Sequence, residues 1–169
     1  MALNKVFDSC RQAVADIPDG ATVMISGFSG PGGYAQNLVR ALRDQGARNL
    51  TIIMCNLGLD YPRVAPPGFV AETFVPIGSL VENGQVKKGI GSWATTTDPS
   101  RPGGFEKAYL AGEVELEVMP QGTLAERIRA GGAGIGAFYS PVGVGTLWEQ
   151  GKEKRVINGR EYLLEYPLK

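Results

Sequence analysis

A glycine-rich segment, Ser26–Gly33, has the residue types that let a backbone approach a negatively charged ligand. It follows a short apolar run with β-branched members and precedes a stretch with helical spacing of apolar residues. Such a loop presents free backbone N–H groups and the positive end of a helix, which suit a phosphate, a carboxylate or an oxyanion. A tight strand-to-helix turn that only needs small residues explains the same pattern, so both interpretations stay open.

The spacing of Gly30, Gly32 and Ala35 also fits a dinucleotide-binding fingerprint, but the surrounding residues do not. Pro31 has no backbone N–H to donate to a phosphate, and the next predicted strand ends without the acidic residue that binds a ribose. No Gly-Lys-Ser or Gly-Lys-Thr follows, so the segment is not the phosphate loop of nucleoside triphosphatases. The sequence therefore argues against both kinds of nucleotide site.

Three further segments carry groups with possible chemistry. The Gln121-Gly122 turn repeats the order of strand end, glycine and helix, and Gln121 can bond either a substrate carboxylate or a neighbouring loop. The small residues of Gly131–Pro141 fit close approach by a coenzyme, by a partner subunit or by the chain's own sheet. Glu82 is a side chain that can attack a thioester, but an ordinary solvated turn explains Glu82-Asn83-Gly84 better.

Composition excludes several classes of site. The chain has no histidine, so a histidine-dependent triad and most zinc sites are excluded within it. Cys10 and Cys55 lack metal-type spacing, and we expect both to be buried thiols without a metal. Seventeen basic residues balance seventeen acidic ones without a basic stripe, which argues against nucleic acid and membrane surfaces. Without a signal peptide or a membrane-spanning run, the expected location is the cytoplasm.

The elements that must position these residues follow an α/β order. Strand Thr22–Ile25, helix Ala35–Leu42 and strand Leu50–Met54 form a βαβ unit, which predicts parallel strands and a right-handed crossover. A helix over Val6–Ile17 precedes them. We therefore predict a single domain over residues 1–169, with an open, mostly parallel sheet and helices on both faces. In such sheets ligands bind beyond the carboxyl ends of the strands.

The rest of the chain yields shorter elements, and Thr123 and Glu126 have the spacing of a helix capping box. The predicted elements are strands Phe69–Val75, Val86–Trp93 and Val114–Val118, helices Phe105–Leu110 and Leu124–Ala130, and a hairpin that turns at Asn158-Gly159.

The order of segments resembles the A (alpha) subunit of the family I coenzyme A transferases, from near the start to the last residue. The match over Pro120–Tyr139 is long and specific, and Gly159–Glu165 also matches. The glycine loop matches partly, because Ser26 and Tyr34 replace a glycine and a proline of the family loop. Since family members continue beyond the position of Lys169, the resemblance also leads us to expect a domain without the family's C-terminal strand and helix.

The resemblance implies transfer of coenzyme A from a short acyl or 3-oxoacyl thioester to a carboxylic acid. It implies a glutamyl–coenzyme A thioester on a partner B subunit, and therefore no catalytic nucleophile in this chain. It further implies a heterotetramer and no permanently bound cofactor, since the coenzyme A thioester is the substrate. This chain would line the substrate, coenzyme A or oxyanion site with Gly27, Phe28, Ser29, Gly30, Gly32, Gly33, Asn56, Gln121 and Gly122.

Two alternatives remain open at the level of sequence. The altered loop is compatible with a heteromeric acyl–coenzyme A decarboxylase or hydrolase on the same fold. The chain is also compatible with a remnant that binds its partner without catalysis. A partner with a Ser-Glu-Asn-Gly glutamate would favour transfer, whereas a partner without it would favour decarboxylation or hydrolysis.

Overall fold

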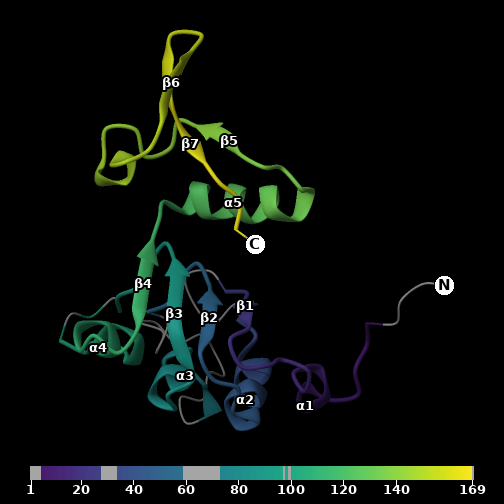
Figure 1. The fold of residues 1–169 in the computed structure, drawn as a ribbon. Coiled ribbons are helices and arrows are strands. Elements are labelled where there is room, and N and C mark those ends of the chain that lie inside the picture. Colours follow the sequence, from purple (N-terminus) through teal and green to yellow (C-terminus); the bar gives the residue numbers. More distant parts are fainter. Residues whose placement is uncertain (1–4, 28–33, 59–72, 97, 99, 169) are drawn as a thin grey trace, which may run out of the picture. The chain divides into compact units, whose positions relative to one another are not determined.

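The computed structural model describes residues 5–27, 34–58, 73–96, 98 and 100–168. The chain divides into two compact units, Met1–Glu117 and Val118–Lys169, and each is described by itself (Figure 1). The single domain expected over residues 1–169 stays a prediction.

The first unit is built on a four-stranded sheet in the order β1-β2-β3-β4. The register pairs Val23 with Ile52 and Ile52 with Gly89 in parallel, and all four arrows run in one direction in Figure 1. The α/β class and the parallel sheet are thereby confirmed. Its elements are α1 (Cys10–Ala13), β1 (Thr22–Met24), α2 (Gln36–Gln45), β2 (Leu50–Ile53), α3 (Gly78–Glu82), β3 (Val86–Gly91), α4 (Gly104–Leu110) and β4 (Glu115–Val118).

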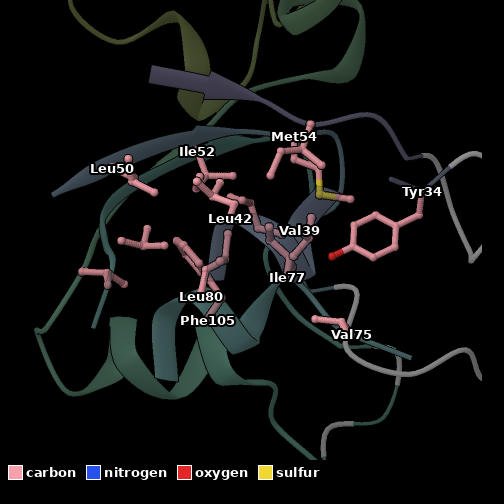
Figure 2. Packing of buried hydrophobic residues seen from close by; sticks show 14 of the residues in the cluster. Tyr34, Val39, Leu42, Leu50, Ile52, Met54, Val75, Ile77, Leu80 and Phe105 are labelled. Carbon is pink, nitrogen blue, oxygen red and sulfur yellow. The ribbon is translucent and has the colours of Figure 1, made fainter. Parts of the chain in front are cut away.

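One hydrophobic cluster joins the helices of this unit to the sheet (Figure 2). Alternate residues of a strand point to the same face, and Leu50, Ile52 and Met54 all belong to the cluster. Helices α2, α3 and α4 add Leu42, Leu80 and Phe105, each at most 2% exposed. These helices therefore share one face of the sheet, and cover by helices on the opposite face stays a prediction.

A buried amide joins the end of α2 to the start of β3. Gln85 is fully buried, and its Nε2 donates to the carbonyl oxygens of Leu42 and Ala47, each at 3.0 Å. Its Oε1 accepts a hydrogen bond of 2.9 Å from Nδ2 of Asn83. Because a buried polar group without partners is costly, this network specifies where α2 ends beside the sheet.

The second unit contains α5 (Gln121–Ala133) and a three-stranded antiparallel sheet in the order β5-β7-β6. Its strands are β5 (Phe138–Ser140), β6 (Lys154–Ile157) and β7 (Arg160–Glu165), and the short 3-10 helix η2 spans Leu147–Glu149. Asn158 and Gly159 have φ angles of 50° and 78°. Two consecutive positive values are those of a type I′ turn, so the predicted hairpin is confirmed.

The segment after β7 lies against α5. The N–H of Leu168 donates to the carbonyl oxygen of Arg127 at 3.0 Å, and Nε of Arg127 donates to the carbonyl oxygen of Tyr166 at 2.7 Å. A Cβ atom on Gly131 would lie 2.0 Å from the Leu168 carbonyl oxygen. Glycine at 131 is therefore required by the chain's own packing, which answers part of the question raised by the small residues of Gly131–Pro141.

Two sequence predictions about helices are wrong. The helix expected over Val6–Ile17 is only the four residues of α1, which bury no side chain. The capping box at Thr123 is wrong because α5 begins at Gln121 with Pro120 in the N-cap position. Thr123 lies inside the helix and is fully buried.

Two further expectations are corrected. Cys10 is exposed, because the short α1 does not bury an apolar face as the predicted longer helix would have done. Residues 69–72 of the predicted strand Phe69–Val75 lie outside the described residues, and Phe74 and Val75 are buried without forming a strand.

Among the helices of the described ranges, none is long and apolar enough to cross a membrane.

Candidate functional site

Two loop segments continue β2 and β3 beyond the carboxyl edge of the parallel sheet. The N–H groups of Ser92 and Trp93 donate to the carbonyl oxygen of Cys55 at 3.1 and 3.0 Å. The N–H of Leu57 donates to the carbonyl oxygen of Trp93 at 2.7 Å, and Asn56 and Trp93 form a parallel bridge. We call these segments, residues 55–58 and 92–95, the paired loops. They lie at the edge where open α/β sheets bind ligands.

The paired loops approach each other too closely to admit a side chain at Gly58. A Cβ atom there would lie 2.1 Å from the carbonyl oxygen of Thr95 and 2.3 Å from its carbonyl carbon. Backbone atoms cannot rotate away from such a contact as a side chain can. Glycine at 58 is thus a condition for the pairing that holds Asn56 and Trp93 in place.

The amide of Asn56 is oriented by its own loop. Its Oδ1 accepts a hydrogen bond of 3.0 Å from the N–H of Gly58, and this bond distinguishes the oxygen from the nitrogen. Among the residues that the structure describes, no acceptor takes a hydrogen bond from the Asn56 NH₂ group. The half-buried side chain can therefore donate to a carbonyl or carboxylate oxygen, and the predicted place of Asn56 in the substrate site stays a prediction.

The neighbouring Cys55 does not have the properties of a nucleophile. Burial raises the pKa of the Cys55 thiol above its ordinary value, because the low-polarity surroundings disfavour the thiolate. Nucleophilic attack requires the thiolate, so the thiol is in its unreactive form at neutral pH. Among the described residues of this edge, Asn56 offers a hydrogen-bond donor, and the raised pKa of Cys55 disfavours a role as nucleophile.

The predicted glycine loop is described only at its first site residue. Gly27 follows β1 with a φ of 142°, and a Cβ atom there would lie 2.8 Å from Cε of Met54. Its lack of a side chain thus serves packing against the core at the carboxyl edge. The remaining predicted loop residues, Phe28, Ser29, Gly30, Gly32 and Gly33, lie outside the described residues.

Gln121 and Gly122 form the start of α5 in the second unit, and both are exposed. The N–H of Leu124 donates to the carbonyl oxygen of Pro120 at 2.9 Å, which is the first hydrogen bond of the helix. The backbone N–H groups of the three residues before Leu124 therefore have no acceptor within the helix backbone. A Cβ atom on Gly122 would lie 3.6 Å from Val142, an ordinary contact. Packing within this unit therefore does not require glycine at 122, and the roles of both residues stay predictions.

Glu82 lies away from the paired loops. It is the exposed last residue of α3, which leads into the start of β3 rather than following its end. The solvated interpretation of Glu82 fits this position. Within the described ranges, no group of three or more His, Cys, Asp or Glu side chains could hold a metal ion.

Sequence reasoning missed Trp93 as a feature of this edge. The residue ends a predicted apolar strand, where burial is the usual expectation, yet it is 53% exposed. The sequence predicts that Trp93 lies at the end of the strand, and β3 does end two residues before it, at Gly91. The environment of the Trp93 side chain depends instead on pairing with a loop almost forty positions earlier. No local pattern carries that information.

Comparison with known proteins gives consistent matches. The family model described as Coenzyme A transferase matches residues 7–169. The A subunit of the 3-oxoadipate CoA-transferase of Pseudomonas putida is 43% identical over 166 residues, which are 98% of this chain and 64% of that protein. The A subunit of the probable succinyl-CoA:3-ketoacid coenzyme A transferase of Bacillus subtilis is 41% identical over 163 residues, 96% of this chain and 60% of that protein. The chain thus spans about three fifths of these relatives.

A solved structure of similar fold is the apoenzyme of an acyl-CoA transferase from E. coli O157:H7. It has a TM-score of 0.73 and 24% identity, and the match covers 98% of this chain and 33% of the other. At this identity the likeness concerns the fold alone, and it supports the α/β architecture of Figure 1.

Proposed function

The chain belongs to the coenzyme A transferase family, and on this basis we propose that it is the A-subunit part of a coenzyme A transferase. The reaction we propose moves coenzyme A between a short acyl or 3-oxoacyl thioester and a carboxylic acid. The observation that carries the proposal is identity above 40% to proteins named as A subunits over nearly the whole of this chain. The names of those relatives also support the substrate class, because both contain 3-oxo acids.

The proposed enzyme has a second, B subunit, since both relatives are named as one subunit of an enzyme. We place the nucleophilic glutamate on that partner and none in this chain. This assignment agrees with the exposed position of Glu82 and with the raised pKa of Cys55. An A-plus-B heterotetramer in the cytoplasm, with the coenzyme A thioester as substrate and no permanently bound cofactor, completes the proposal.

The role proposed for this chain is to bind and polarise the reacting carbonyl. When a carboxylate attacks a thioester, negative charge develops on the carbonyl oxygen as the carbon–oxygen bond forms. A donor that is already oriented stabilises this charge without reorganising. The NH₂ group of Asn56 fits that task, because Gly58 fixes the amide through Oδ1. Backbone N–H groups of the predicted loop residues Gly27, Phe28, Ser29, Gly30, Gly32 and Gly33 are proposed to line the substrate as well. For Gln121 and Gly122, at the start of α5, binding of a substrate or of coenzyme A is a separate proposal.

The decisive test is purification of this chain with its partner, followed by a transfer assay with succinyl-CoA and a 3-oxo acid. We expect a product thioester only when both substrates are present, with ping-pong kinetics and a covalent coenzyme A adduct on the partner. Release of coenzyme A without an acceptor acid would instead indicate a hydrolase, and release of carbon dioxide a decarboxylase. Binding of coenzyme A without turnover would indicate the non-catalytic remnant.

A further inference from the structure

Trp93 presents an aromatic surface at the carboxyl edge of the sheet. Its side chain is 53% exposed, whereas its backbone is fixed by hydrogen bonds to Cys55 and Leu57 at 3.0 and 2.7 Å. Large exposed aromatic side chains on a rigid backbone are typical of binding surfaces, because little conformational entropy is lost when they make contact. The position is therefore suited to contact with a ligand.

The bridge between Asn56 and Trp93 makes the two side chains neighbours. Residues paired on adjacent strands lie about 4.8 Å apart and send their side chains to the same face. The indole of Trp93 thus lies beside an amide nitrogen that has no acceptor among the described residues. A ligand whose carbonyl oxygen is bound by Asn56 would place the atoms next to that carbonyl against the indole.

The described parts of the paired loops bring no cation to this surface. Residues 55–58 are Cys-Asn-Leu-Gly and residues 92–95 are Ser-Trp-Ala-Thr. A terminal carboxylate on the acyl chain would find no lysine or arginine in these segments, and its desolvation would be unfavourable. An uncharged chain would instead bury apolar surface against the indole.

We propose that Trp93 is a specificity-determining residue that packs against the acyl group of the thioester and favours uncharged acyl chains over those that end in a carboxylate. The inference rests on the proposed function, because it assumes that an acyl thioester occupies this edge. It goes beyond that function by naming the residue that selects the acyl group and the direction of the selection.

The test compares two donors of four carbons, butanoyl-CoA with a methyl end and succinyl-CoA with a carboxylate end. In the complex with the partner, we expect Trp93→Ala to lower the ratio of kcat/KM for butanoyl-CoA over succinyl-CoA about tenfold, and Trp93→Phe to retain most of it. The matched control is Tyr109→Ala. Tyr109 is 48% exposed on α4, which leads into the start of β4 and so lies toward the opposite edge. An unchanged ratio in Trp93→Ala would overturn the proposal.

A partner contact is the competing explanation for an exposed tryptophan. Size-exclusion chromatography of the same variants separates the two. We expect Trp93→Ala to elute with its partner as the wild type does. Dissociation of that variant, with Tyr109→Ala still assembled, would assign Trp93 to the subunit interface and overturn the proposal.

A binding readout makes the proposal independent of turnover. The chain has two tryptophans, and the other, Trp148, donates its indole N–H to Glu165 at 2.7 Å. The fluorescence difference between the complexes with Trp148→Phe and with Trp148→Phe plus Trp93→Phe reports on Trp93 alone. We expect butanoyl-CoA to change this signal saturably and coenzyme A alone to change it much less. Equal changes with both would mean that Trp93 contacts the coenzyme, which contradicts the proposal.

The kinetic and fluorescence experiments together distinguish a failure of acyl selection by Trp93 from a failure of the proposed function. If the wild-type complex transfers no coenzyme A but the Trp93 signal responds to butanoyl-CoA and not to coenzyme A, the proposed function fails and acyl recognition stands. If transfer occurs and the donor ratio is the same with and without the indole, acyl selection by Trp93 fails and the function stands.

Discussion

The Asn56 amide has two tasks in our proposal. Its oxygen accepts a hydrogen bond from its own loop, and its nitrogen, which has no acceptor among the described residues, donates to the substrate. Asn56 was named as a site residue through the family resemblance, which carries positions that local pattern does not. The exposure of Trp93 was not predictable in the same way, because it arises from a pairing between loops far apart in the chain. The role of Asn56 thus stays a prediction, and Trp93 was not named from the sequence at all.

Replacing Asn56 by Asp separates the two tasks of the amide. The aspartate keeps an oxygen for the N–H of Gly58 but has no N–H to donate to a substrate. We expect the free energy of unfolding to change by less than about 1 kcal/mol and kcat/KM to fall by about 10²-fold, since a hydrogen bond to developing charge is lost. Thermal melts and transfer kinetics measure both. A large loss of stability with a proportionate loss of activity would mean that Asn56 is only structural.

The pKa of the Glu149 carboxyl in the second unit depends on its ion pair with Lys154. Hydrogen bonds from Lys154 at 2.7 Å and from the N–H of Gly145 lower the pKa of the Glu149 carboxyl below its usual value. Since the folded pKa is depressed, the stabilisation is fully present above the usual glutamate pKa and is lost as the pH falls through the lowered value. Carbon NMR should find a Glu149 pKa below that of an ordinary glutamate. In Lys154→Gln it should move up toward the ordinary value, and an unmoved pKa would contradict the assignment of Lys154 as its main cause.

At the scale of elements, those with a local signal were predicted well. The β6–β7 hairpin follows from Asn158-Gly159 between two apolar runs, and β2 and β3 follow from short β-branched runs. The start of α5 was missed, because Thr123 and Glu126 have capping-box spacing although the helix already begins after Pro120. The three residues of β5 were missed because their pairing partner, β7, lies more than twenty positions later.

Two adjacent glycines of α5 should respond in opposite ways to the same substitution. In Gly131→Ala the new methyl group would lie 2.0 Å from the Leu168 carbonyl oxygen, so we expect a loss of about 1–3 kcal/mol of stability. In Gly132→Ala no atom lies within 4 Å of the new methyl group, so better helix propensity should add up to about 1 kcal/mol. Denaturant unfolding of both variants measures the contrast. Equal effects would mean that the segment after β7 is not packed on α5 in solution.

At the scale of the whole molecule, the sequence predicted the class and the parallel sheet, because apolar runs alternate with amphipathic segments. It did not predict that residues 118–169 would form a compact unit with its own antiparallel sheet. That sheet depends on three short strands whose pairing is set by tertiary contacts rather than by residue type. The predicted site residues are likewise divided between the units, with Asn56 in the first and Gln121 in the second.

Hydrogen exchange should rank the elements by their burial. The β2 residues Leu50, Ile52 and Ile53 are at most 3% exposed, and β2 has a paired strand on both sides. We expect its amides to exchange at least about 10²-fold more slowly than those of α1, which buries no side chain and has only four residues. Mass spectrometry of peptic peptides measures this difference. Fast exchange in β2 would contradict the central position of that strand.

The close contact between Gly58 and Thr95 has a consequence for protein engineering. The backbone of the paired loops is specified by main-chain hydrogen bonds, by this contact and by the bond from Gly58 to Oδ1 of Asn56, and not by the side chain of Trp93. A mutant library that randomises position 93 while it keeps Asn56 and Gly58 should therefore retain folded members at high frequency. The same library with position 58 randomised should be recovered almost entirely as glycine, so directed evolution of acyl preference has a variable position on an invariant support.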